Sequence, residues 1–199
     1  MSLLKSAWEI ALERTEGIEA DSDKIRKDGL IDKGKRIAGT YLSDIEATFE
    51  QLESNVKEHC EEDRPFVIQG LSMTLLANVA LPQNDEFKER IERMQRIASV
   101  IDGEEGDSVE LLGQIASFME KYLEAKETLL ERARAQYKPM FEQKQQQMMS
   151  QYGRSTYSSM EQDPEFIQFI QKNYNQLADQ YQQTLDGAKD QLKEKWNLE

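Results

Sequence analysis

Hydrophobic and polar residues recur along most of this chain with the period of an α-helix, and one stretch departs from that pattern. Phe66 to Leu81, FVIQGLSMTLLANVAL, contains no charged residue, although 32% of the whole chain is charged. Such a run predicts a helix that is apolar on all sides and is buried at the centre of a bundle. Pro65 suits the first turn of that helix, and Pro82 forces the residue before it out of helical geometry. The two prolines therefore bracket the predicted helix.

Two helices are predicted before this central run. The first ends at about Glu16, because Gly17 follows, and its apolar residues are spaced by three or four: Leu4, Ala7, Trp8, Ala11 and Leu12. The second begins at the N-cap signal of residues 21–23, DSD. It keeps a narrow, coiled-coil-like seam that consists of Ile31, Gly34, Ala38, Leu42, Ile45, Phe49, Leu52 and Val56.

Two more helices are predicted after the central run. The first buries a stripe made of Phe87, Ile91, Met94, Ile97, Ala98 and Ile101. A charged loop with two glycines, residues 102–106, separates it from the longest predicted helix. Asp107 and Glu110 have the spacing of a capping box at the start of that helix, and Pro139 should kink or interrupt it near its end. Two adjacent apolar stripes on this helix indicate more than one packing partner.

Composition changes in the last third of the chain, where 14 of the 19 glutamines lie at or after Gln136. Residues 143–159 have too few apolar side chains to bury a face, and we expect a mobile connector there. Asp163 and Pro164 then supply an N-cap and a first helical residue. The last helix carries a stripe made of Ile167, Ile170, Tyr174, Leu177, Tyr181, Leu185, Ala188, Leu192 and Trp196. It packs either as an antiparallel hairpin on the preceding long helix or on a partner subunit.

The sequence therefore predicts an all-α fold in three parts. Residues 1–142 form a bundle of long amphipathic, partly coiled-coil-like helices around the central apolar helix. Residues 143–162 form a connector rich in Gln and Ser, and residues 163–199 form a C-terminal amphipathic helix that packs on the bundle or on a partner subunit.

Charge and cysteine content narrow the classes of function. The net charge of −13 and the pI of about 4.7 disfavour nucleic acid and anionic membrane surfaces, because both would repel the chain. The central apolar run is shorter than the roughly 20 residues that cross a bilayer. The single cysteine, Cys60, excludes an intramolecular disulfide, and the N-terminal residues lack the pattern of an export signal. We therefore expect a cytoplasmic protein.

One stretch imitates a nucleotide-binding motif. Residues 29–35, GLIDKGK, match the GxxxxGK of a phosphate-binding loop. That motif requires a preceding strand and a Ser or Thr after the lysine, whereas Arg36 follows here and no strand is predicted. We interpret Gly34 and Gly39 as small helical residues that let a neighbouring helix approach closely.

The scarcity of histidine limits metal binding and catalysis. His59 is the only histidine, so the two Glu-x-x-His motifs of di-metal carboxylate bundles cannot be assembled. His59, Cys60 and Glu62 could contribute to a surface metal site, although such a cluster at a helix end is more commonly just solvated. On a helix, His59 and Cys60 point about 100° apart, which disfavours a Cys/His nucleophile. We assign no catalytic, cofactor-binding or metal-binding residue.

Three segments resemble an uncharacterised family of bacterial helical proteins of unknown function. They are SAWEIALERTEGI (6–18), GKRIAGTYL (34–42) and LLANVALPQND (75–85). The resemblance is strongest in the first half of the chain and fades through the glutamine-rich region. It implies a bacterial source and assigns no activity and no residue role.

The sequence leaves the function unknown. The leading hypothesis is a non-enzymatic helical interaction or structural protein that acts through protein–protein contacts, with a protein partner or as a homo-oligomer. The rival is a carboxylate-lined metal-binding bundle or enzyme, which would need inward-facing Glu and Asp side chains. A binder of apolar ligands that uses Met73, Leu76 and the aromatic stripes is a third hypothesis.

Overall fold

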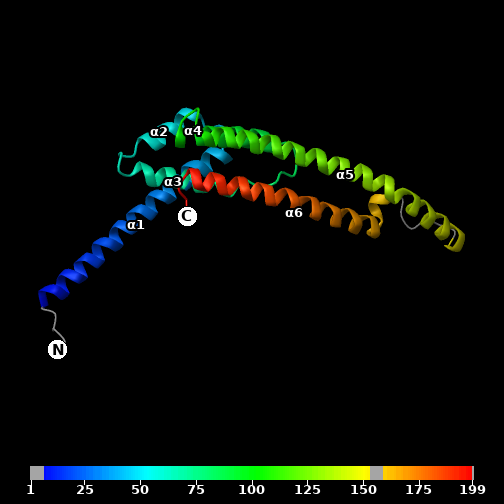
Figure 1. The fold of residues 1–199 in the computed structure, drawn as a ribbon, viewed down its shortest axis with the longest axis horizontal. Helices are drawn as coiled ribbons and strands as arrows, with labels where there is room; N and C mark the ends of the chain where they lie inside the picture. The colour runs from blue at the N-terminus through cyan, green and yellow to red at the C-terminus, as the bar shows by residue number, and fades with distance from the viewer. Residues whose placement is uncertain (1–6, 153–158, 199) are drawn as a thin grey trace. The chain divides into compact units, whose positions relative to one another are not determined.

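The computed structural model describes residues 7–152 and 159–198, which form helices joined by loops; for residues 7–21 and Tyr152 only the backbone is described. Within these residues there is no strand, so the predicted all-α class is confirmed. The arrangement of the helices as a single bundle stays a prediction. Figure 1 shows the elements, which are α1 (Ala7–Ser43), α2 (Phe49–Lys57), α3 (Arg64–Asn78), α4 (Phe87–Asp102), α5 (Asp107–Tyr152), the 3-10 helix η1 (Met160–Gln162) and α6 (Pro164–Lys195).

Packing divides the chain into two units, which are described separately. The first unit comprises Met1–Val79, Glu92–Glu110 and Leu192–Glu199, and the second comprises Ala80–Ile91 and Leu111–Gln191. These boundaries differ from those predicted from the sequence, which divide the chain after residues 142 and 162. The predicted division into three parts stays a prediction.

Helix α1 does not end where the sequence suggested. It runs without a break through Gly17 to Ser43, whereas we expected one helix to stop near Glu16 and a second to continue to Val56. A glycine inside a helix costs only about 1 kcal/mol relative to alanine, which is too little to force an end. The break lies instead at residues 44–48, so Ile45 is on a loop and 78% exposed.

Helices α1 and α3 meet at two glycines. A Cβ atom added to Gly34 would overlap the carbonyl oxygen of Val67 and lie 3.0 Å from the Cα of Gly70. A Cβ added to Gly70 would overlap the carbonyl oxygen of Ile31 and lie 2.8 Å from the backbone nitrogen of Lys35. The interpretation of Gly34 as a site of close approach is therefore confirmed. The same interpretation of Gly39 is wrong, because nothing lies within 4 Å of a Cβ added there.

The predicted central helix is observed as α3, with a shorter span than the uncharged run. Pro65 lies in its first turn, and the helix ends at Asn78 because Val79 is extended, with φ −77° and ψ 102°. Val67, Leu71 and Leu75 are fully buried, whereas Met73 is 41% exposed. One side of α3 therefore faces solvent. Among the described residues, no helix combines the length and the apolar character that crossing a membrane requires.

The turn between α4 and α5 is capped differently from the prediction. Asp107 does not act as the N-cap; the carboxylate of Asp102 accepts hydrogen bonds from the Ser108 backbone N–H at 3.2 Å and from the Ser108 hydroxyl at 2.6 Å. Gly103 has φ +94°, and a Cβ on Gly106 would overlap the Asp102 carboxylate. Gly103 is therefore required by its backbone conformation, and Gly106 leaves room for the Asp102 carboxylate.

In the second unit, α6 packs antiparallel on α5. The ring of Tyr181 lies 4.9 Å from that of Phe118 and 5.1 Å from that of Tyr122, and the ring of Phe166 lies 5.2 Å from that of Tyr137. The first buried residue of α6 is Phe166, at 3% exposed; the predicted one, Ile167, is 51% exposed.

Helix α5 is longer than expected. It is continuous across Pro139 and ends at Tyr152, so the interruption near Pro139 is not observed and residues 143–152 are helical instead of belonging to a connector. Residues 153–158 of the expected connector lie outside the described residues.

The glycine contact between α1 and α3 generates a stability prediction. We expect Gly34→Ala and Gly70→Ala each to lower the free energy of unfolding by roughly 2 kcal/mol or more, because the added methyl must push two backbones apart. Gly39→Ala on the same helix is the matched control, and it should be stabilising by about 0.5–1 kcal/mol. Urea unfolding followed by circular dichroism measures all three. Equal effects at Gly34 and Gly39 would show that the two helices do not meet as described.

Candidate functional site

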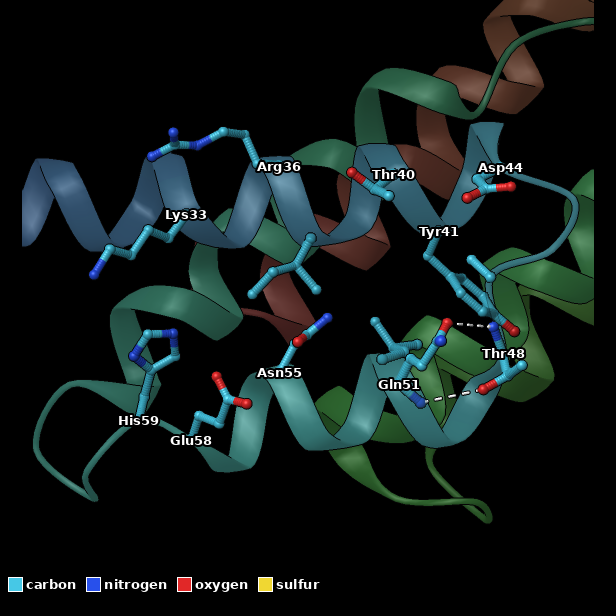
Figure 2. A pocket seen from close by; sticks show the side chains of 13 residues that line it. Lys33, Arg36, Thr40, Tyr41, Asp44, Thr48, Gln51, Asn55, Glu58 and His59 are labelled. Atoms are coloured by element: carbon cyan, nitrogen blue, oxygen red, sulfur yellow. Dashed lines mark hydrogen bonds between the residues drawn. The ribbon is translucent and has the colours of Figure 1, made fainter.

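A solvent-open groove of about 500 Å³ lies between α1 and α2 in the first unit. Figure 2 shows Lys33 and His59 at one end and Thr48 and Gln51 at the other. The apolar part of its lining consists of Ile37, Tyr41, Ala47 and Leu52. The polar part consists of Lys33, Arg36, Thr40, Asp44, Thr48, Gln51, Asn55, Glu58 and His59.

The end of the groove beside the loop is fixed by a capping box at the start of α2. The Gln51 N–H donates to the Thr48 hydroxyl at 3.3 Å, and the Thr48 N–H donates to the Gln51 side chain at 3.1 Å, as the dashed lines in Figure 2 mark. Leu52 and Val56 on the same helix are buried. The local sequence TFEQ therefore starts the helix. Because Leu52 and Val56 are buried, it is mainly the polar side of α2 that is left to line the groove.

Arg93 of α4 holds the loop at the end of α1. Its Nε donates to the carbonyl of Tyr41 at 2.8 Å, and one terminal nitrogen donates to the carbonyls of Asp44 at 2.5 Å and Ala47 at 3.3 Å. The guanidinium carbon also lies 4.7 Å from the centre of the Tyr41 ring. The last carbonyls of a helix lack partners within the helix and carry partial negative charge. Arg93 donates hydrogen bonds to carbonyls at the end of α1 and in the loop that follows, and it thereby fixes the loop that borders the groove.

The charges around the groove are of both signs. Lys33 and Arg36 of α1 supply the positive charges, while Asp44 and Glu58 supply carboxylates. Figure 2 shows the side chain of Arg36 on the side of α1 away from α2. The groove therefore has an apolar floor and a polar rim of mixed charge.

The residues considered for chemistry do not converge. His59 lines the groove, while Cys60 and Glu62 are exposed. Among the residues with described side chains, no three His, Cys, Asp or Glu are placed to hold a metal ion. Gly29 and Gly34 of the GxxxxGK match lie inside α1, so the stretch forms no phosphate-binding loop.

A second polar cluster lies in the second unit, around a fully buried carboxylate. Asp163 is 0% exposed and accepts hydrogen bonds from the Tyr137 hydroxyl at 2.9 Å and from the Lys144 ammonium at 2.9 and 3.0 Å. It also accepts from the Glu165 backbone N–H at 3.1 Å, as an N-cap does. The N-cap role was predicted from Asp163 and Pro164, but Tyr137 and Lys144 were missed. Their spacing of seven, which places both on one side of α5, is the signal that was available.

These contacts shift the pKa values of all three groups. Burial and then the hydrogen bond to Asp163 raise the pKa of Tyr137 to about 12. Burial opposes ionisation of Asp163, but hydrogen bonds from Lys144, the Glu165 N–H and Tyr137 outweigh it and hold its pKa below the usual value. The hydrogen bond to Asp163 raises the pKa of Lys144. The carboxylate is thus kept ionised and fully occupied, which makes it a clamp between α5 and the start of α6.

The Tyr137 pKa generates a test of this clamp. Because the folded-state value lies above the usual 10, the contribution to stability is present below pH 10 and is lost as pH rises toward about 12. For Asp163, whose pKa is lowered, the contribution is present at neutral pH and is lost as pH falls below the usual carboxyl range. The difference in tyrosinate absorbance between the parent and Tyr137→Phe isolates one of the seven tyrosines. A transition near pH 10 in that difference would mean that the phenol is neither buried nor bonded to Asp163.

Arg93 provides a test of the groove wall. Arg93→Ala removes three hydrogen bonds from a charged donor, and we expect a loss of about 2 kcal/mol in the free energy of unfolding. Faster amide hydrogen exchange should be confined to the loop 44–48 and the adjoining turns. Arg93→Lys keeps the charge but not the fork-shaped set of donors, so it should restore only part of the loss. Unchanged exchange in the loop of Arg93→Ala would contradict the role given to Arg93.

Comparison with known proteins gives one match. The model of a family of unknown function, DUF6657, matches residues 53–194. No curated protein and no solved structure matches the chain. The matched residues include α3 with Gly70, Arg93 and the cluster around Asp163, whereas all of α1 precedes them. Since the match covers more than half of the sequence, the chain belongs to DUF6657, a family of unknown function.

Proposed function

We propose that this is a non-enzymatic interaction protein that acts through protein–protein contacts and associates with itself. The observation that carries the proposal is the surface of α1 over residues 22–29, where all eight residues are exposed. Ile25 within this segment is 72% exposed. Burying an isoleucine side chain is worth roughly 1.5–3 kcal/mol, so a second helix on this surface would gain stability from it.

Contacts within the chain use only one side of this segment. Arg26 forms an ion pair with Asp63 at 2.5 Å, and the Lys27 ammonium lies 5.4 Å from the centre of the Phe66 ring. Neither contact covers Ile25. A helix gains most of its stability from packing of its apolar side. The described residues of the chain leave Ile25 uncovered, so this part of α1 can still pack against another helix.

The groove between α1 and α2 supports the same class of function. It has the apolar floor and the charged rim of a protein contact surface, and it is built from the helix that carries the exposed segment. The net charge of −13 favours a protein partner over nucleic acid or an anionic membrane, and with these we propose a cytoplasmic location.

The rival function, a carboxylate-lined metal site or active site, requires inward-facing acids with free oxygens. In the part of the chain with described side chains, Asp163 is the one buried carboxylate. Its oxygens accept from Tyr137, Lys144 and the Glu165 N–H. This carboxylate serves packing of the second unit, and no observation favours the rival.

The exposed isoleucine provides the test of self-association. Sedimentation velocity of the full chain over a micromolar concentration range should give a mass above that of one chain. Ile25→Asp should raise the dissociation constant about tenfold or more, because the interface would then bury an unpaired carboxylate.

Ile45→Asp is the matched control, since Ile45 is 78% exposed but lies on the loop after α1. It should leave the mass distribution unchanged. A parent chain that sediments as a monomer at all concentrations would exclude self-association, and equal effects of both substitutions would exclude this segment of α1 as the contact.

A further inference from the structure

The charges of α1 are segregated along its length. Residues 9–23 contain six acidic residues and one basic residue, a net charge of −5, and residues 24–36 contain six basic and two acidic residues, a net charge of +4. The acidic block consists of Glu9, Glu13, Glu16, Glu19, Asp21 and Asp23 against Arg14. The basic block consists of Lys24, Arg26, Lys27, Lys33, Lys35 and Arg36 against Asp28 and Asp32. Both blocks lie on one continuous helix.

A basic block of this density is unusual in a chain with a net charge of −13. Part of it is used within the chain, because Arg26 pairs with Asp63 at 2.5 Å. The side chains of Lys24, Lys33 and Arg36 are exposed. The basic block therefore presents positive charge to solvent from the same helix that carries the exposed Ile25.

We infer that two copies of this protein pair through α1 in antiparallel orientation, with the acidic block of each helix along the basic block of the other. The inference rests on the proposed self-association and names its geometry. The two-fold axis falls near the boundary of the blocks, between Asp23 and Lys24, which brings the two exposed Ile25 side chains close to the axis.

Charge complementarity selects this orientation. In a parallel pair, each block would face its own copy, and like charges would repel along the whole helix. In an antiparallel pair, both blocks face opposite charge, and the two-fold symmetry makes every favourable contact twice. Such an interface is self-complementary and closed, so it yields a dimer and not a filament.

The complementarity predicts a dependence on salt that needs no substitution. The Debye length falls from about 10 Å at 0.1 M to about 3 Å at 1 M ionic strength. The dissociation constant of the parent dimer should therefore rise roughly tenfold over this range. A dimer that is unaffected or tightened by salt would overturn the inference, whatever the variants do.

Charge reversal tests the orientation directly. One full-length variant carries Glu13→Lys, Glu16→Lys and Glu19→Lys, a second carries Lys24→Glu, Lys33→Glu and Arg36→Glu, and a third combines all six. Each of the first two should raise the dissociation constant roughly tenfold or more at low salt. The combined variant should bind more tightly than either single-block variant but less tightly than the parent, because its two blocks carry net charges of +1 and −2, which are again opposite in sign but smaller.

Two controls separate this effect from net charge and from folding. A variant with Glu104→Lys, Glu127→Lys and Glu131→Lys has the same change in net charge as the first one, at exposed positions outside α1, and should keep the parent affinity. Circular dichroism and thermal melting confirm that each variant is folded. An equal loss in the control variant would assign the effect to net charge and overturn the inference.

The outcomes distinguish the inference from the function on which it rests. A parent chain that stays monomeric at low salt would exclude both the proposed self-association and the antiparallel α1 pair. A parent dimer whose affinity is unchanged in the two single-block variants, or is no higher in the combined variant than in either of them, overturns the antiparallel α1 pair and leaves self-association in place.

Discussion

Two helix backbones meet at Gly34 and Gly70 with no side chain between them, and the packing of the first unit depends on that contact. The overlap that a methyl group would create involves backbone atoms, the carbonyls of Val67 and Ile31, which cannot move aside as the end of a flexible side chain can. The close approach lets Val67, Leu71 and Leu75 reach complete burial. Dense packing around short side chains gains dispersion contacts that a wider crossing would lose.

Polar contacts hold the helix ends and loops, whose positions apolar packing alone does not determine. In the first unit, Arg93 gathers three backbone carbonyls at the end of α1 and covers the Tyr41 ring. In the second unit, Asp163 holds Tyr137 and Lys144 of α5 beside the first turn of α6. Arg93 and Asp163 are both charged, and other groups of the same chain form hydrogen bonds with each of them. Such hydrogen bonds offset the free energy that is lost when a charged group is removed from water. They act on helix ends and loops, where the apolar pattern carries the least information.

The sequence predicted the features that depend on periodicity. The buried stripe of α4 from Phe87 to Ala98, the placement of Pro65 in the first turn of α3 and the N-cap role of Asp163 all follow from local spacing, and the structure confirms them. The last residue of the predicted stripe, Ile101, is only partly buried. Predicted ends were wrong where a weak local signal competed with continuous packing. Gly17 and Pro139 both disfavour a helix, yet α1 and α5 run through them. A cost of one to a few kcal/mol at a single residue does not end a helix that is stabilised over many turns.

The contact of Arg93 beside the groove and the clamp could not be predicted, because both join residues that are distant in the sequence. Arg93 is separated from Tyr41 by 52 positions and Tyr137 from Asp163 by 26, and nothing in local spacing pairs them. The signals that existed were short ones, such as the TFEQ capping box at Thr48. That signal, unlike Gly17, marked the true break between α1 and α2.

The continuity of α1 changes the meaning of its charges. A helix that ended at Gly17 would have separated Glu9, Glu13 and Glu16, which are half of the acidic residues of positions 9–23, from the basic residues of positions 24–36. On one helix with a rise of about 1.5 Å per residue, the same residues form a rod with opposite charges on its two halves. A rod of this kind is complementary to its own copy turned end over end and to no copy in the same direction. For the proposed association, the structural fact that matters is therefore the absence of a break at Gly17, which places both groups of charges on one helix.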